Sequence, residues 1–235
     1  MRALPTPASP ATRARSGRQC GRTRGRQADR PDKPAGSARN LSRRIGPEQV
    51  IAIGASTGGT EAIRHLLAAL PPPARRSDRA THASRLHPQF ASRLNGLSAL
   101  DVREAVSGET LQRGRAYLAP GGRHMRVVAR AAQRVLRLDD QTEVNGHRPS
   151  VDVLFDSVAD VIGSKAVGVI LTGMGKDGAK GLLHMREKGA CTLGQDQASC
   201  VVYGMPREAV TVGGVELVLP LGDIGPTLAQ AITGQ

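Results

Sequence analysis

The stretch from Val50 to Leu70 constrains the fold of this chain more than any other. Four apolar residues, Val50 to Ile53, lead into a turn of small residues, and a helix-like segment follows at residues 61–70. An apolar run of this kind is typical of a strand buried on both faces. The turn, residues 54–58, reads Gly-Ala-Ser-Thr-Gly. Between a strand and a helix, Gly-x-Ser-x-Gly is the pattern of a nucleophile elbow, so the sequence predicts an exposed Ser56 hydroxyl at the edge of a sheet.

Two other interpretations of the same turn stay open at this point. Ser56 or Thr57 would serve equally well as the cap of the following helix. A Gly-rich turn at a helix start also suits a bound phosphate. The turn has neither the Gly-x-Gly-x-x-Gly fingerprint nor the lysine of a P-loop. The free N–H groups and the positive end of the helix dipole favour an oxyanion as readily as a phosphate.

A second constellation follows another apolar run, Ala166 to Leu171. The run leads into a Gly-rich loop, residues 172–178, and a helical segment begins at Ala179. Asp177 stands just before that helix, where an aspartate often acts as a cap. Alternatively, Asp177 orients a catalytic imidazole while the backbone N–H of Met174 faces an oxyanion. Spacing alone leaves both roles open.

The order of the segments predicts the fold class. Strand-like and helical segments alternate, which indicates an α/β protein with a doubly wound, mostly parallel sheet and helices on both faces. Residues 124–128 and 135–138 alternate as a small antiparallel hairpin does. Sheets of this class bind ligands at the carboxyl ends of their strands. We therefore expect both Gly-rich loops at one edge of the sheet.

The net charge of +13 is concentrated in two stretches. Residues 1–44 hold 12 basic and 2 acidic residues, and residues 74–90 hold 4 arginines and 1 aspartate, which leaves the remainder neutral. Residues 1–44 contain few large apolar residues, so we predict a basic disordered tail before a domain at 45–235. No aromatic residues are interleaved to stack bases, so we expect no specific nucleic-acid binding.

The composition of the chain also predicts where the protein resides and whether it binds a cofactor. No apolar run reaches membrane-span length and no signal-peptide pattern begins the chain, so we expect a cytoplasmic protein without membrane insertion. The three cysteines lack metal-ligand spacing, so neither a metal nor another cofactor is expected.

Four ordered motifs, at residues 51–63, 147–155, 168–178 and 198–209, resemble the catalytic domain of the bacterial chemotaxis protein-glutamate methylesterase (CheB) family. The resemblance implies that Ser56 is the nucleophile and Asp177 the acid of a Ser-His-Asp triad. It further implies that Thr57 and the Met174 amide bind the oxyanion. The implied substrates are glutamate methyl esters, and also glutamines, on methyl-accepting chemotaxis receptors. No cofactor is implied, and we expect a monomer.

The chain departs from the family pattern in two places. The family usually carries a phosphorylatable receiver domain before the catalytic domain, where this chain has only the basic tail. We therefore expect no control by phosphorylation within the chain. The family also has an apolar strand ending in Gln-His-Met-Pro, whose histidine is the base. Here residues 74–89 are polar and basic, and they look unsuited to a strand.

A shifted reading frame accounts for residues 74–89. Read one base later from Arg75, codons for these residues can spell Gly-Val-Val-Ile-Val, then Gln-His-Met-Pro, then Ala-Gly-Phe-Thr-Arg-Ser, and the frame returns at Phe90. In the chain as it stands, Thr81 occupies the place of the base and His82 follows one position later. We take His82 as the candidate base, although a one-residue slip in a strand reverses the side chain's face. We take the remaining histidines as surface or packing residues. The chain is therefore predicted to be a methylesterase that, as it stands, has little or no esterase activity. The alternative is a catalytically impaired receptor-binding module.

Overall fold

The structure is a computed structural model that describes residues 49–71, 79–86 and 88–233. Of residues 72–89 it describes no side chains. The predicted basic tail at residues 1–44 lies outside the described part of the chain. All described residues belong to one unit, Lys33–Gln235.

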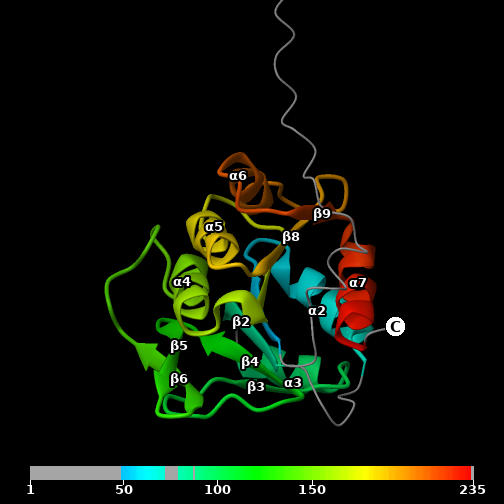
Figure 1. Cartoon of the computed structure of the whole chain (residues 1–235). Helices are drawn as coiled ribbons and strands as arrows, with labels where there is room; N and C mark the ends of the chain where they lie inside the picture. The colour runs from blue at the N-terminus through cyan, green and yellow to red at the C-terminus, as the bar shows by residue number, and fades with distance from the viewer. Residues whose placement is uncertain (1–48, 72–78, 87, 234–235) are drawn as a thin grey trace, which may run out of the picture. The chain divides into compact units, whose positions relative to one another are not determined.

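A seven-stranded sheet forms the centre of this unit (Figure 1). All neighbouring strands of the sheet run parallel to one another. In spatial order they are β3 (Asp101–Glu104), β4 (Arg115–Pro120), β2 (Arg79–Leu86), β1 (Val50–Gly54), β7 (Ala166–Ile170), β8 (Cys191–Gln195) and β9 (Leu217–Leu219). A separate antiparallel pair consists of β5 (His124–Arg130) and β6 (Gln133–Asp139). The predicted fold class, a mostly parallel sheet with a small hairpin, is confirmed.

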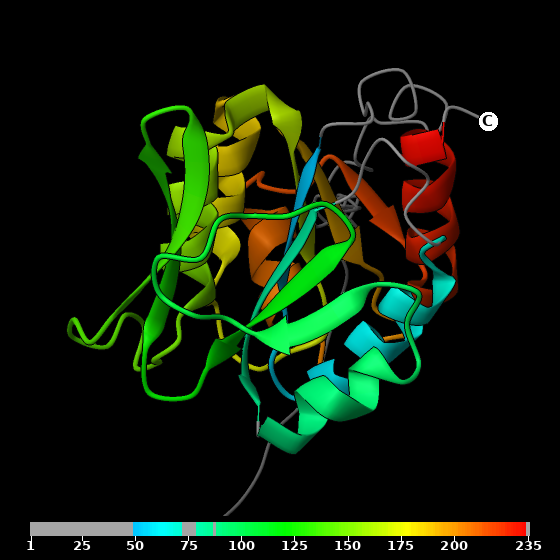
Figure 2. The ribbon, with the colours of Figure 1, turned by 90° about the horizontal axis from the view of Figure 1, so that it is seen from below.

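Helices cover the two faces of the sheet (Figures 1 and 2). One apolar cluster joins the sheet to α2 (Gly59–Ala69), α3 (Pro88–Asn95) and α7 (Leu221–Thr233). The other joins it to the hairpin and to α4 (Val151–Val161), α5 (Ala179–Glu187) and α6 (Met205–Thr211). A 3₁₀ turn, η1 (Gly163–Lys165), links α4 to β7. Alternate residues of β1 enter the two clusters, Ile51 and Ile53 the first, Val50 and Ala52 the second. That alternation explains why a doubly buried strand reads as an unbroken apolar run.

Strands β1 and β7 lie at the switch point of the sheet, where the order in which the chain adds strands reverses. Elements β2 to β4 lie on one side of β1, while β7 to β9 extend the sheet on the other side. The two central strands are in register, with Gly54 opposite Ile170 at their carboxyl ends. Doubly wound sheets bind ligands in the crevice at such a switch point. The loops that carry Ser56 and Asp177 therefore leave the sheet at one edge, as the sequence predicts.

Strand β2 contradicts the expectation that residues 74–89 are unsuited to a strand. Residues Arg79–Leu86 pair in parallel with β1 on one side and β4 on the other. The hydrogen bonds between strands are made by backbone N–H and C=O groups, so they form whatever the side chains are. Without β2, the facing edges of β1 and β4 would have backbone groups without hydrogen-bond partners. His82 lies opposite Ile53 of β1, and the register against β4 becomes irregular between His82 and Leu86.

None of the helices in the described residues combines the length and the apolar character that a membrane crossing requires.

Candidate active site

Ser56 is exposed on the loop between β1 and α2, whereas Gly54 and Ala55 before it are buried. The N-cap residue before α2 is Gly58, in the left-handed conformation with φ +79°, and no side chain caps this helix. The interpretation of Ser56 or Thr57 as a helix cap is therefore wrong. Position 58 requires glycine for two reasons. Its φ is positive, and a Cβ there would lie 2.7 Å from the Cβ of Val201.

The loop that carries Ser56 is joined by hydrogen bonds to the loop after β7. The Ser56 N–H donates to the carbonyl of Thr172 at 3.1 Å, and the Thr172 hydroxyl donates to the carbonyl of Thr57 at 3.1 Å. Gly173 lies against the nucleophile, because a Cβ at this position would be 3.0 Å from the Cβ of Ser56 and 2.2 Å from the sulfur of Met205. Only a glycine fits between these two side chains without moving them.

Two backbone amides at this junction remain available as donors. Because the Ser56 amide is already bonded to Thr172, it is occupied. In the described part of the chain, the amides of Thr57 and Met174 have no hydrogen-bond acceptor. These are the two residues that the sequence interpretation assigns to the oxyanion. The Met174 side chain is itself 69% exposed.

Asp177 is buried, with 4% of its surface exposed, and its carboxylate faces the start of α4. It accepts hydrogen bonds from the backbone amides of Val151 (2.8 Å) and Asp152 (3.2 Å). The Ser150 hydroxyl donates to it at 2.6 Å and the Asn145 side-chain amide at 3.0 Å. Ser150 is the N-cap of α4, but its hydroxyl makes no cap bond. Asp177 therefore caps α4 rather than α5, the helix that it precedes.

Asp152 is a second buried carboxylate beside Asp177. It accepts the backbone amide of Gly181 at 2.7 Å and the Asn145 side-chain amide at 2.7 Å. Burial raises the pKa of Asp152 above its usual value, and the negative charge of Asp177 adds to this effect, against the bond from Gly181 that lowers it. Two carboxylates and one amide thus form a compact polar cluster under the β7–α5 loop.

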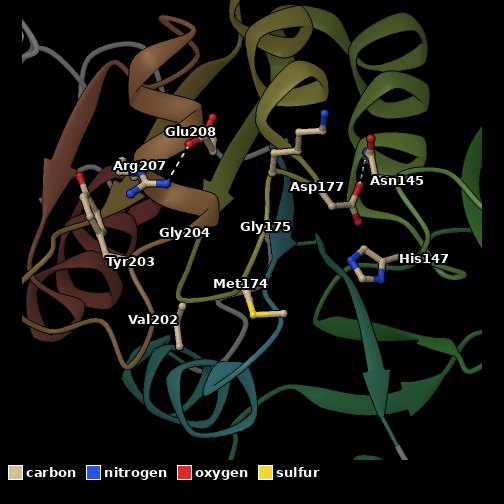
Figure 3. A pocket seen from close by; sticks show the side chains of 11 residues that line it. Asn145, His147, Met174, Gly175, Asp177, Val202, Tyr203, Gly204, Arg207 and Glu208 are labelled. Carbon is tan, nitrogen blue, oxygen red and sulfur yellow. Dashed lines mark hydrogen bonds and ion pairs between the residues drawn. The ribbon is translucent and has the colours of Figure 1, made fainter.

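A pocket of about 690 Å³ opens beside this cluster (Figure 3). Asn145, His147 and Asp177 lie on one side of it, Tyr203 and Arg207 lie on the other, and Met174 lies between the two sides. The residues that line it are Asn145, His147, Met174, Gly175, Lys176, Asp177, Val202, Tyr203, Gly204, Arg207 and Glu208. Ser56 and Thr57 are not among them, so Met174 and Asp177 are the predicted site residues that line this pocket.

The histidines differ in what the structure says of them. The side chain of His82 lies outside the described residues. His124 is fully buried, and its Nδ1 accepts the Ser150 amide while its Nε2 donates to the Thr142 carbonyl, which makes it a packing residue as expected. His184 contacts Asp156 and Asp160 on the surface.

His147 is more than a surface residue, because it lines the pocket together with Asp177. The sequence interpretation missed this residue. Its place three residues before Ser150, in one of the four family motifs, was the available signal.

Comparisons with known proteins agree with this arrangement. The family model described as CheB methylesterase matches residues 51–228. A protein of Pectobacterium atrosepticum named protein-glutamate methylesterase/protein-glutamine glutaminase is 52% identical over 196 residues, which are 81% of this chain and 55% of the relative. A Burkholderia pseudomallei protein of the same name, numbered 1, is 52% identical over 181 residues, 77% of this chain and 50% of the relative. The chain thus spans about half the length of the curated relatives it matches.

A solved structure shows the same likeness in three dimensions. The crystal structure of the Thermotoga maritima CheB methylesterase catalytic domain superposes with a TM-score of 0.74 at 34% sequence identity. The match covers 78% of this chain and 98% of that domain. The sheet with its switch point, the serine loop and the matched residues together lead to one conclusion: the chain belongs to the CheB methylesterase family.

Proposed function

We propose that residues 45–235 are a methylesterase catalytic domain that hydrolyses glutamate methyl esters on chemoreceptors through an acyl-enzyme on Ser56. The observation that carries the proposal is the position of Ser56 and Asp177. They follow the two adjacent strands of the switch point, and Ser56 is exposed while Asp177 is buried. The names of the 52% identical relatives supply the reaction class, together with glutamine deamidation as a second reaction.

The first half of the proposed reaction forms the acyl-enzyme. An imidazole base takes the proton of the Ser56 hydroxyl as its oxygen attacks the ester carbonyl carbon. The carbonyl oxygen becomes an oxyanion, for which the amides of Thr57 and Met174 are the available donors. Each such donor lowers the barrier by about 3 kcal/mol. The C–O bond to the methoxy group then breaks, and the imidazolium returns the proton so that methanol leaves.

The second half restores the enzyme. The base takes a proton from water as the water oxygen attacks the acyl carbon, and the bond to the Ser56 oxygen then breaks while the imidazolium returns the proton to that oxygen. The products are the glutamate side chain and free Ser56. In both halves Asp177 accepts an N–H of the imidazole, which fixes its tautomer and stabilises its cation.

The base is proposed to come from β2. This strand is the neighbour of β1, and its carboxyl end lies at the same edge of the sheet as Ser56. His82 is the candidate base on this strand. His147 is the second candidate, because it lines a pocket with Asp177.

We further propose that residues 74–89 as they stand keep turnover low. Polar and basic residues occupy a strand between β1 and β4, where the family has an apolar one. The base would also be one position away from its place in the family pattern. A chain that keeps the scaffold but turns over slowly would act mainly as a receptor-binding module, which is the second candidate function.

Hydrolysis of a small methyl ester tests the nucleophile directly. The full chain is compared with Ser56→Ala, Asp177→Asn, and Thr60→Ala as a control in the first turn of α2, since Thr60 is exposed and has no assigned role. We expect Ser56→Ala to remove all hydrolysis above background and Asp177→Asn to lower it by about 10⁴-fold, as loss of the orienting acid does in other triads. Hydrolysis above background that Ser56→Ala does not reduce would refute the proposal.

A parallel pair of variants identifies the base. If His82 is the base, His82→Ala lowers the rate of Ser56 acylation and His147→Ala leaves it within about twofold, and the reverse pattern assigns the role to His147.

A further inference from the structure

The amide of Asn145 bridges the two buried carboxylates of the site. Its nitrogen lies 2.7 Å from Oδ2 of Asp152 and 3.0 Å from Oδ1 of Asp177. A carboxylate only accepts hydrogen bonds, so both contacts require the amide nitrogen rather than its oxygen. Both N–H bonds of the amide are therefore used, one for each carboxylate.

The position of Asn145 is set by a tight turn. Val144 and His147 exchange two backbone hydrogen bonds, and between them Asn145 and Gly146 both have positive φ, +55° and +73°. Asn-Gly is the preferred pair for a turn with two positive φ values. Glycine would serve that backbone need equally well at residue 145. The turn therefore accounts for the conformation of Asn145 but not for its two bonds.

Helices α4 and α5 cap one another through the same two carboxylates. Asp177, which precedes α5, accepts the amides of Val151 and Asp152 in the first turn of α4. Asp152, in the first turn of α4, accepts the amide of Gly181 in α5. A Cβ on Gly181 would lie 2.7 Å from the Cβ of Phe155, so the helices approach closely here. These backbone amides alone make the two helix caps. The Asn145 side chain comes from a separate loop and is not needed for capping.

The bonds to Asp177 are divided unequally between its two oxygens. Oδ1 accepts the Ser150 hydroxyl, the Asp152 amide and the Asn145 side chain. Oδ2 accepts the Val151 amide and, within the described residues, nothing else. Each carboxylate oxygen has about two acceptor positions, so Oδ1 is filled and Oδ2 has one left.

We propose that Asn145 is a positioning residue for Asp177, because its amide ties Oδ1 to Asp152 and leaves Oδ2 as the oxygen that receives the N–H of the catalytic imidazole. The inference rests on the proposed function of Asp177. The bridge also keeps the two like-charged carboxylates together, since a donor shared between them offsets their repulsion. Asn145 lines the pocket as well, so it stands between the solvent and the buried pair.

The main test is Asn145→Gly in the full chain. Glycine tolerates the positive φ of the turn, so the variant removes the Asn145 side chain with its amide without straining the backbone. Glu143→Gln, at an exposed position on the same loop, is the matched control. Ser56 is labelled with a fluorophosphonate, whose reaction needs the activated serine but no bound receptor. We expect the labelling rate of Asn145→Gly to fall about tenfold, on the scale of a lost hydrogen bond to a charged group. The control should stay within about twofold of the parent chain.

Methyl ester hydrolysis separates positioning from substrate contact. If Asn145 positions Asp177, kcat falls in Asn145→Gly while KM is unchanged. The kcat of Asn145→Asp should be lower still, because this variant replaces two hydrogen-bond donors by a third carboxylate. A raised KM with unchanged kcat would overturn the proposal, because Asn145 would then act as part of the pocket wall.

A measurement without substrate tests whether the Asn145 amide bonds to Asp152, independently of activity. The carboxyl carbon of Asp152 is followed by ¹³C NMR through a pH titration. Loss of the amide removes a donor to the charged form, so the pKa of Asp152 should rise further in Asn145→Gly. An unchanged titration overturns the bridge whatever the activity. Failure of the proposed function would appear elsewhere, as hydrolysis that Ser56→Ala does not reduce.

Discussion

At the scale of single residues, the site depends on where two carboxylates are buried. Asp177 and Asp152 both serve as helix caps, yet their environments differ. Asp177 receives four donors, whereas Asp152 receives two and has a raised pKa. Burial is the main cause of the raised pKa of Asp152, and the negative charge of Asp177 nearby adds to it.

The raised pKa of Asp152 predicts how stability depends on pH. An acid whose pKa is higher in the folded state binds its proton more tightly there than in the unfolded chain. The free energy of unfolding therefore falls as the pH rises from the ordinary aspartate value towards the raised one. Asp152→Asn cannot titrate, so this part of the pH dependence should vanish. Urea unfolding of both chains between about pH 4 and pH 7 measures it. Identical pH dependence in the two chains would show that Asp152 does not titrate differently on folding.

Gly173 gives a second prediction at this scale. A Cβ at this position would meet the sulfur of Met205 and crowd Ser56, so Gly173→Ala should cost about 1–3 kcal/mol of unfolding free energy. It should also slow labelling of Ser56, because the serine must move. Gly121→Ala is the control, since a Cβ there has no atom within 4 Å. Thermal unfolding compares the three chains. Equal losses in the two variants would mean that close packing at Gly173 is not the cause.

The residue scale also shows how far the sequence could predict the site. Ser56 and Asp177 each follow a recognisable apolar run and a Gly-rich turn, so both were singled out as candidates. Asn145 was not, because an Asn-Gly pair indicates only a turn, and its contact with Asp177 joins residues 32 positions apart. His147 was missed for the same reason, since no local pattern says which loop folds over a pocket.

At the scale of elements, most boundaries follow from periodicity. Strands β1 and β7 read as apolar runs because both faces are buried, and α4 shows helical spacing because one face meets α5 and the sheet. Strand β2 is the exception. Its residues carry no strand pattern, and its place is fixed by its neighbours β1 and β4.

Replacing residues 75–89 tests the shifted-frame account of β2. The replacement is Gly-Val-Val-Ile-Val-Gln-His-Met-Pro-Ala-Gly-Phe-Thr-Arg-Ser. Burying apolar side chains in an inner strand contributes about 25 cal/mol per Å², so the urea midpoint should rise, and the returned histidine should raise ester hydrolysis. A scrambled version of the same fifteen residues is the control. The coding DNA offers an independent check, since codons that cannot spell this segment in the shifted frame would refute the account.

At the scale of the whole molecule, charge and catalysis are expected to reside in different parts. Residues 1–44 carry +10 from 12 basic and 2 acidic residues, whereas the rest of the chain outside residues 74–90 is neutral. The CheB methylesterase family model matches residues 51–228, outside the basic segment. We therefore expect the basic segment to influence binding to polyanions without influencing the site.

Deletion of residues 1–44 tests this separation. The full chain should bind DNA weakly and without sequence preference, and binding should weaken steeply with salt because counterions are released. The shortened chain should lose that binding and keep its unfolding midpoint and its rate of Ser56 labelling. Retention of DNA binding after the deletion, or a clear preference for one DNA sequence, would contradict the expectation.

The most direct test of the account is methanol release from methylated chemoreceptors by the chain with replaced residues 75–89, with and without Ser56→Ala. We predict rapid release from the replaced chain, little from the original chain, and none above background once Ser56 is alanine. Undiminished release from Ser56→Ala, or no release from the replaced chain, would contradict the assignment of Ser56 as the acylated nucleophile of this domain.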